Sequence, residues 1–190
     1  NSGNSFKVFR IPFFFPQYLE YLHSFQLNPK REVSMKYDNG NMEIVIYGTW
    51  IRAMYYETLI MSIVNEVYSR SFPDQENLLA KAANDLSIKL NRIHTYNETA
   101  PRNLKIIEFG TRRRFSADWQ DQVVGFLKNI VGENCLGTSN VFLARQWKMK
   151  PIGTHGHEWF MGSQAFHPVQ NSQYVGFEKW LDLYKENLAI

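Results

Sequence analysis

Residues 104–114, which read Leu-Lys-Ile-Ile-Glu-Phe-Gly-Thr-Arg-Arg-Arg, decide the fold of this 190-residue chain. The first six residues predict a short strand, because they are mostly apolar and the Gly-Thr pair that follows interrupts them. Ser116 can then cap a helix that we expect to reach about Val131. A strand followed at once by a helix is the unit from which parallel sheets are built.

The same order of strand and helix recurs twice further along the chain. Residues 134–137 predict a second strand, with a helix over about 140–148. Residues 151–154 predict a third, with a helix over about 158–165. Either an α/β barrel or an open parallel sheet fits this order. A last helix, over about 173–186, precedes the end of the sequence, where the next strand is expected.

The first fifty residues predict a mixed α+β unit. Residues 13–16 open an apolar helix over residues 18–22. Further on, residues 32–37 and 42–47 read as strands that flank Asn39-Gly40, a pair that tolerates the positive φ angles of tight turns. The sequence therefore predicts a β-hairpin here.

Two helices are expected between this hairpin and the parallel strands. The helix over residues 53–68 is apolar on most sides, so we expect it to be buried. The helix over residues 74–94 carries an apolar stripe on one face. We therefore expect part of an α+β domain with the hairpin at residues 1–50, connecting helices at 51–100 and the first half of an α/β barrel at 101–190.

Composition narrows the class of protein. The chain is 44% hydrophobic and 21% charged, as is ordinary for a soluble globular protein, and its net charge of +3 favours no nucleic-acid partner. Its single cysteine, Cys135, cannot form an internal disulfide. No stretch reaches the roughly 18 apolar residues of a membrane span, and residues 1–5 read as a linker or a cut end rather than a signal peptide. We expect a cytoplasmic protein with no membrane partner.

Glycine, threonine and polar side chains follow each of the three expected strands, at residues 109–114, 137–140 and 153–159. In parallel α/β architectures ligands bind beyond the carboxyl ends of the strands, so we expect these loops to meet on one face. The triple arginine suits a carboxylate or phosphate, although a structural ion-pair cluster is the alternative. Ser139 precedes a helix whose N-terminus attracts anions, although it can equally be a helix cap.

Residues 155–158, His-Gly-His-Glu, allow several interpretations. No further Cys or His lies at useful spacing, so we expect no metal site. One histidine can be a hydrogen-bonded core residue, or a nucleophile or acid–base group held by Glu158. Cys135 lies inside an expected strand, where packing is the better interpretation.

These loops resemble the motifs of nicotinate phosphoribosyltransferases. The similarity rests on residues 108–116, 137–144 and 151–160, three motifs in order and at fitting intervals, and it extends to residues 12–14 and 38–40. Each motif alone is modest, but the three together are specific.

The resemblance implies a type II phosphoribosyltransferase fold, a partial α/β barrel preceded by part of an α+β domain, and a homodimer with shared active sites. It implies transfer of phosphoribose from phosphoribosyl pyrophosphate to nicotinate, forming nicotinate mononucleotide in NAD biosynthesis. ATP, with Mg²⁺ on the phosphate substrates, is expected to drive this step through a phosphohistidine. His157 matches that histidine, and Glu158 is expected to assist it.

The resemblance also implies roles for the loop residues. Phe109 is expected to stack on the pyridine ring, Arg112 and Arg113 to hold the pyrophosphate and carboxylate groups, and Thr154 to contact nicotinate. Further phosphate contacts are expected from two residues, Arg114 and Thr138.

Ser139 predicts the acid rather than the amide as substrate. Related nicotinamide-using enzymes carry an aspartate at this place, and a second carboxylate near that of nicotinate would cost about 1–4 kcal/mol at 4 Å. A serine removes this repulsion and can donate a hydrogen bond.

Two other classes fit less well. Quinolinate phosphoribosyltransferase shares the fold type but uses no ATP, which the histidine motif argues against. A non-catalytic binding module remains open, and His155 has no assigned role. Half a barrel cannot close, so we expect the sequence to belong to a longer chain and predict that 190 residues alone are inactive.

Overall fold

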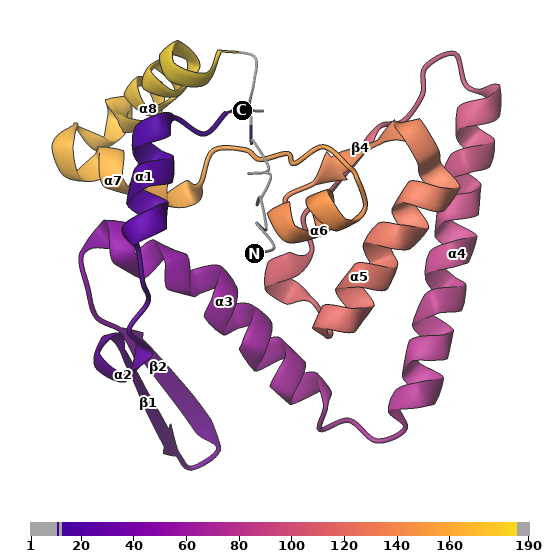
Figure 1. Cartoon of the computed structure of the whole chain (residues 1–190), viewed down its shortest axis with the longest axis horizontal. Helices are drawn as coiled ribbons and strands as arrows, with labels where there is room; N and C mark the ends of the chain where they lie inside the picture. Colours follow the sequence, from indigo (N-terminus) through magenta and orange to yellow (C-terminus); the bar gives the residue numbers. More distant parts are fainter. Residues whose placement is uncertain (1–10, 12, 186–190) are drawn as a thin grey trace, which may run out of the picture. The chain divides into compact units, whose positions relative to one another are not determined.

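The computed structural model describes Ile11 and residues 13–185, and the chain divides into two compact units (Figure 1). One unit is formed by residues 27–152, the other by residues 1–26 and 153–190. The linker expected at residues 1–5, Pro12 of the resemblance and the end of the chain after residue 185 lie outside the described residues.

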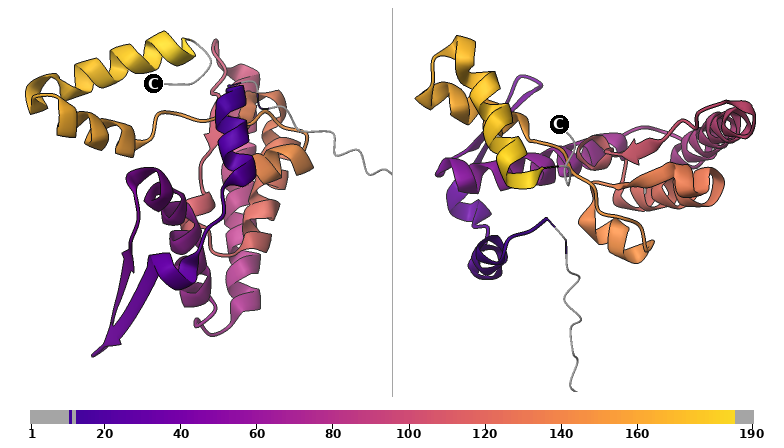
Figure 2. Two further views of the ribbon diagram at one scale, coloured as in Figure 1. Left: turned by 60° about the vertical axis from the view of Figure 1, so that its left-hand side comes forward. Right: turned by 90° about the horizontal axis from the view of Figure 1, so that it is seen from above.

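The larger unit begins with the predicted hairpin, which is confirmed. After the short helix α2 (Pro29–Glu32), strands β1 (Val33–Asp38) and β2 (Asn41–Ile46) pair antiparallel, with Asp38 opposite Asn41. The turn between them places Asn39 at φ 47° and Gly40 at φ 83°, as the Asn-Gly pair predicts. The hairpin extends away from the helices of this unit as a two-stranded arm (Figure 2).

Glu32 ties the base of the hairpin to helix α3 (Trp50–Ser69). Its carboxylate accepts hydrogen bonds from Arg52 Nε at 2.7 Å, from the Tyr56 hydroxyl and from the Asn28 amide at 2.8 Å. The hydrogen bonds from Arg52, Tyr56 and Asn28 lower the pKa of Glu32 from 4.5 to about 2. The hairpin is therefore held by an ionised carboxylate at its base.

Helix α3 is not the buried helix that its composition predicts. Only Tyr56, Ser62 and Ser69 are buried, whereas eight large apolar side chains of the helix are at least 36% exposed. The physical reason is that the short helix η1 (Thr111–Arg113) and the hairpin base cover part of its surface only. An apolar composition predicts burial only where other elements cover the whole helix.

Helix α4 (Gln75–Thr99) runs five residues beyond the expected end at His94. His94 Nε2 lies 3.3 Å from Glu98 Oε1, one turn further along the helix. The Asn97 side chain donates to the Leu104 carbonyl and accepts from the Leu104 amide. These contacts extend the helix to the segment that contains Pro101.

The core of this unit lies between α4 and the run formed by α5 (Ala117–Phe126) and the π-helix η2 (Leu127–Val131), which lie side by side (Figure 1). Ser116 caps α5 by accepting from the Trp119 amide at 3.0 Å, as predicted. The buried centre of the core consists of Leu90, Leu127, Val131 and Cys135. Burial also raises the pKa of the Cys135 thiol, which favours the packing interpretation.

Two of the three expected strands form a parallel pair, β3 (Ile106–Glu108) and β4 (Cys135–Thr138), the latter preceded by η3 (Gly132–Asn134) and followed by α6 (Val141–Gln146). The third is reduced to isolated bridge residues, of which Pro151 forms a parallel bridge with Thr138. There the Thr138 amide donates to the Lys150 carbonyl at 3.2 Å, and the Ile152 amide donates to the Thr138 carbonyl at 3.0 Å. The described residues thus form a mixed α/β structure in which no closed barrel is seen.

The smaller unit contains α1 (Pro16–Ser24), α7 (His157–Phe166) and α8 (Val169–Tyr184). Aromatic rings of α7 and α8 contact one another, and the Trp159 indole donates to the Gly176 carbonyl at 2.9 Å. A side chain at Gly176 would come within 2.9 Å of the Phe160 ring, so α7 and α8 pack closely at this glycine. None of the described helices is both long and apolar enough to cross a membrane.

Candidate functional site

Two of the predicted loops meet at the carboxyl ends of β3 and β4. Glu108 ends β3 and is only 5% exposed, and its carboxylate accepts hydrogen bonds from the Gly110 amide, from Gln120 Nε2 at 2.6 Å and from the Thr138 hydroxyl at 2.5 Å. The Ser139 amide donates to the Glu108 carbonyl at 2.9 Å. The parallel arrangement therefore brings together the two loops that the sequence predicts to share a ligand.

Asn140 connects the same loops a second time. Its backbone amide donates to the Thr138 hydroxyl at 3.0 Å, and its side-chain amide donates to the Thr111 hydroxyl at 3.1 Å. Its side-chain oxygen accepts from the Leu143 amide at 3.1 Å. Asn140, not Ser139, is therefore the cap of α6, which leaves the Ser139 side chain outside the capping interaction.

The arginine turn is anchored to α3 by acidic and amide side chains. Arg112 forms an ion pair with Glu57, and its carbonyl accepts from Asn65 Nδ2 at 3.1 Å. Arg114 lies 3.5 Å from Glu66, which also accepts from the Ala117 amide at 3.0 Å. For these two arginines the structure shows the ion pairs that the sequence left open as an alternative.

Arg113 differs from its two neighbours. It is exposed and forms no ion pair with any of the described residues. Its guanidinium is therefore the part of the turn that can receive an anionic ligand without first giving up a carboxylate partner.

Phe109 and Ser139 occupy equivalent places in the two loops. Each follows directly after a buried residue, Glu108 or Thr138, whose side chain points into the fold. The Phe109 ring is 47% exposed and Ser139 is partly buried. An exposed ring and a hydroxyl-bearing residue at neighbouring strand ends suit a flat, aromatic ligand with one polar group.

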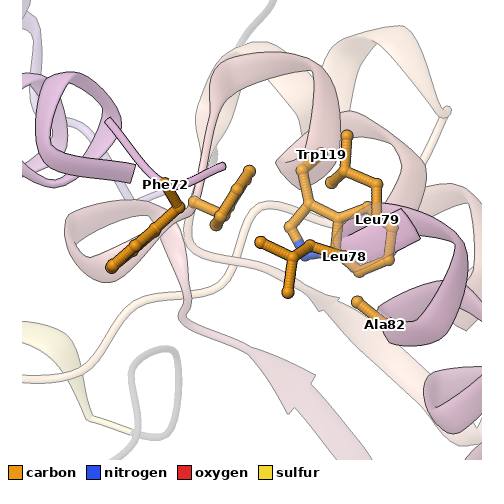
Figure 3. Close-up of a pocket in the computed structure, with 6 residues that line it drawn as sticks. Phe72, Leu78, Leu79, Ala82 and Trp119 are labelled. Carbon is orange, nitrogen blue, oxygen red and sulfur yellow. The ribbon is translucent and has the colours of Figure 1, made fainter. Parts of the chain in front are cut away.

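An apolar hollow of about 330 Å³ lies near this turn but has the wrong chemistry for an anionic substrate (Figure 3). Its walls are formed by apolar side chains, Phe72, Leu78, Leu79, Ala82, Phe115 and Trp119. No charged side chain lines it, so a phosphate or carboxylate would lose its hydration there without a partner.

The remaining predicted residues belong to the smaller unit. His157 is the first residue of α7, its side chain is 58% exposed, and its Nδ1 lies 3.5 Å from Glu158 Oε2. Thr154 is exposed, and its hydroxyl donates to the His155 carbonyl at 3.2 Å.

His155 is the packed histidine of the pair. Its ring makes edge contacts with Phe160, Phe177 and Trp180, with centroids 4.8 to 6.1 Å apart. Of the two histidines, His157 is the one whose ring is mostly exposed.

Sequence reasoning missed the supporting residues on α3 and α5, namely Glu57, Asn65, Glu66 and Gln120. A signal for two of them was present, because Glu57 and Glu66 are the only acidic residues of a helix that is otherwise mostly apolar. Nothing in the local pattern indicates that Gln120 reaches the end of β3.

Comparisons with known proteins agree with the motifs. The model of the nicotinate phosphoribosyltransferase (NAPRTase) family matches residues 104–190, and that of the NAPRTase N-terminal domain matches residues 7–65. Nicotinate phosphoribosyltransferase of Vibrio campbellii is 35% identical over 190 residues, covering 94% of this chain and 42% of the relative. The nicotinate phosphoribosyltransferase of Pseudomonas savastanoi pv. phaseolicola is 38% identical over 186 residues, covering 95% of this chain and 44% of the relative.

Solved structures show the same likeness. The crystal structure of nicotinate phosphoribosyltransferase from Vibrio cholerae matches with a TM-score of 0.77 and 37% identity, over 90% of this chain and 41% of the other. The crystal structure of the enzyme from Porphyromonas gingivalis matches with a TM-score of 0.76 and 30% identity, over 93% of this chain and 44% of the other. The chain thus spans less than half the length of these relatives.

Proposed function

The chain belongs to the nicotinate phosphoribosyltransferase family, and on that premise we propose that it carries nicotinate-binding and phosphohistidine parts of an enzyme that forms nicotinate mononucleotide. In this reaction nicotinate nitrogen displaces pyrophosphate from C1 of phosphoribosyl pyrophosphate. The observation that carries the proposal is the meeting of the Phe109 and Ser139 loops at the ends of β3 and β4.

The exposed Phe109 ring is proposed to stack on the pyridine ring, which contributes about 0.5–1.5 kcal/mol beyond area burial. Ser139 donates a hydrogen bond to the substrate carboxylate, whereas an aspartate there would repel it. The contact between Thr154 and nicotinate stays a prediction from the resemblance. Together Phe109 and Ser139 distinguish nicotinate from nicotinamide.

Arg113 is proposed to make the first contact with the pyrophosphate, because it is exposed and has no ion pair among the described residues. Arg112 joins it when a substrate anion replaces Glu57, and Arg114 when one replaces Glu66. The Thr138 hydroxyl already donates to Glu108 and accepts from Asn140, which favours a supporting role over the predicted phosphate contact.

His157 is proposed to take the γ-phosphoryl group of Mg²⁺-bound ATP. An imidazole nitrogen forms the new P–N bond as the bond to the leaving ADP oxygen breaks, and Glu158 orients the ring from the Nδ1 side. As the first residue of a ten-residue helix, His157 carries the new negative charge where the helix dipole stabilises it. The phosphorylated site then binds phosphoribosyl pyrophosphate more tightly and couples ATP cleavage to product formation.

We further propose that the parallel strands begin a type II phosphoribosyltransferase barrel, and that the enzyme is a cytoplasmic homodimer with shared active sites. The domain boundaries near residues 50 and 100 stay a prediction.

The test is mononucleotide formation from phosphoribosyl pyrophosphate by the chain expressed in its full reading frame. Nicotinate, nicotinamide and quinolinate are compared, each with and without ATP. Turnover of nicotinate that ATP stimulates supports the proposal. Preference for nicotinamide or quinolinate would contradict the role of Ser139 or of the histidine motif, and no turnover with any acceptor would favour a binding module.

A further inference from the structure

Glu108 is a buried carboxylate with no direct part in the proposed reaction. Its side chain lies at the end of β3, faces the interior and collects hydrogen bonds from three segments, through Gly110, Gln120 and Thr138. An ionised carboxylate only accepts hydrogen bonds, and all three partners are donors. A buried charge is costly unless it is satisfied in this way, so the donors fix the carboxylate in one position.

The bond between Glu108 and Thr138 crosses from one loop to the other. Thr138 is fully buried, and its hydroxyl oxygen lies 2.5 Å from Glu108 Oε2. The next residue after each is a proposed contact of nicotinate: Phe109 with the pyridine ring and Ser139 with the carboxylate. Phe109 is held on both flanks, because the Gly110 amide also donates to Glu108. A Cβ atom on Gly110 would lie 2.8 Å from Glu108 Oε1, so a larger residue there would push against the Glu108 carboxylate.

The arginine turn has its own anchors. Glu57, Asn65 and Glu66 of α3 hold it through side chain and backbone, and these contacts do not involve Thr138, which is linked to the turn only indirectly, through the hydrogen bonds of Asn140. Loosening the Glu108–Thr138 bond therefore disturbs the spacing of Phe109 and Ser139 more than it disturbs the arginines.

We infer that Glu108 is a positioning residue, whose bond to the Thr138 hydroxyl sets the spacing between Phe109 and Ser139 and so the affinity and selectivity for nicotinate. The inference rests on the proposed function. It assigns Glu108 no contact with substrate, only control of the two residues that contact it.

Two variants of Thr138 separate positioning from stability. Thr138→Val keeps the volume but removes the hydroxyl, whereas Thr138→Ser keeps the hydroxyl but removes a fully buried methyl group. In the full reading frame we expect T138V to raise the KM for nicotinate about tenfold, with a smaller preference over nicotinamide. We expect T138S to stay within about twofold of wild type in this KM even though it melts at a lower temperature. The KM for phosphoribosyl pyrophosphate should change less than that for nicotinate in T138V.

Equal nicotinate KM values in the two variants, in an enzyme that turns over nicotinate, would overturn the role of Glu108 alone. An equal rise in both substrate KM values in T138V would do the same. Absence of nicotinate turnover by the wild-type protein would instead overturn the proposed function together with this inference. If T138V does not fold, Thr138→Cys takes its place, since a thiol is a weaker donor of similar size. A T138C variant with the nicotinate KM of T138S would then contradict the inference.

Discussion

Gly137→Ala should destabilise the larger unit through a single backbone contact. Gly137 has φ 154°, and a Cβ atom there would lie 2.1 Å from the Lys150 carbonyl oxygen and 2.9 Å from Ile152. Residues 150–152 must therefore move away from β4 to make room for the alanine side chain. The two hydrogen bonds at stake join Thr138 to Lys150 and Ile152 to Thr138.

The magnitude follows from these contacts. Two lost hydrogen bonds cost about 2 kcal/mol, and an alanine at this φ adds about 1–2 kcal/mol of strain. Alanine also makes the unfolded chain less flexible, which stabilises the folded protein by about 0.4–1 kcal/mol. The free energy of unfolding should therefore fall by about 2–4 kcal/mol in total. Gly132→Ala is the matched control: Gly132 also has a positive φ, 62°, but an added Cβ meets nothing within 4 Å. We expect it to cost at most about 1.5 kcal/mol.

Urea denaturation of the full reading frame, followed by tryptophan fluorescence, measures both free energies of unfolding. The nicotinate KM of G137A should rise as well, because Ser139 lies two residues further along β4 and its loop. A G137A protein as stable as G132A would refute the close approach of Lys150 to β4.

Three further predictions concern charge and chemistry. The pKa of Glu32 falls from 4.5 to about 2 on folding, so its stabilisation of the hairpin base is complete above about pH 4.5 and is lost as the pH falls toward 2. The melting temperatures of wild type and Glu32→Gln should therefore converge over this range. A difference that stays constant would contradict the role of the ionised Glu32 carboxylate at the hairpin base. Ser139→Asp should shift the ratio of nicotinate to nicotinamide turnover toward the amide by about tenfold, which initial rates with each acceptor measure; an unchanged ratio removes the argument from Ser139. His157→Ala should abolish the stimulation of turnover by ATP, and stimulation that persists in this variant would exclude the phosphohistidine.

Local patterns predicted much of the fold. The Asn39-Gly40 turn, the Ser116 cap and the succession of β3, α5, β4 and α6 all depend on residues close in sequence, and the structure contains each of them. The exposure of α3 could not be predicted in this way, because it depends on which elements cover the helix. The reduction of the third strand to a bridge at Pro151 likewise depends on tertiary pairing.

The sequence predicted the residue types of the candidate site. It did not predict which of these residues are paired with other side chains and which are left exposed. Three consecutive arginines look equivalent in the sequence, yet Arg112 and Arg114 face carboxylates of α3 and Arg113 does not pair with a described residue. Glu108 looked like one residue of the strand expected over residues 104–109, and only the fold shows Thr138 and Gln120 donating to it. Such long-range pairings leave no periodic signal in one sequence.

A crystal structure of the full reading frame with nicotinate bound tests the central claim most directly. The account predicts the pyridine ring on the face of Phe109, with its carboxylate within hydrogen-bond distance of Ser139 and the Glu108–Thr138 bond intact. Nicotinate bound elsewhere, with Phe109 and Ser139 both free of the ligand, would contradict it.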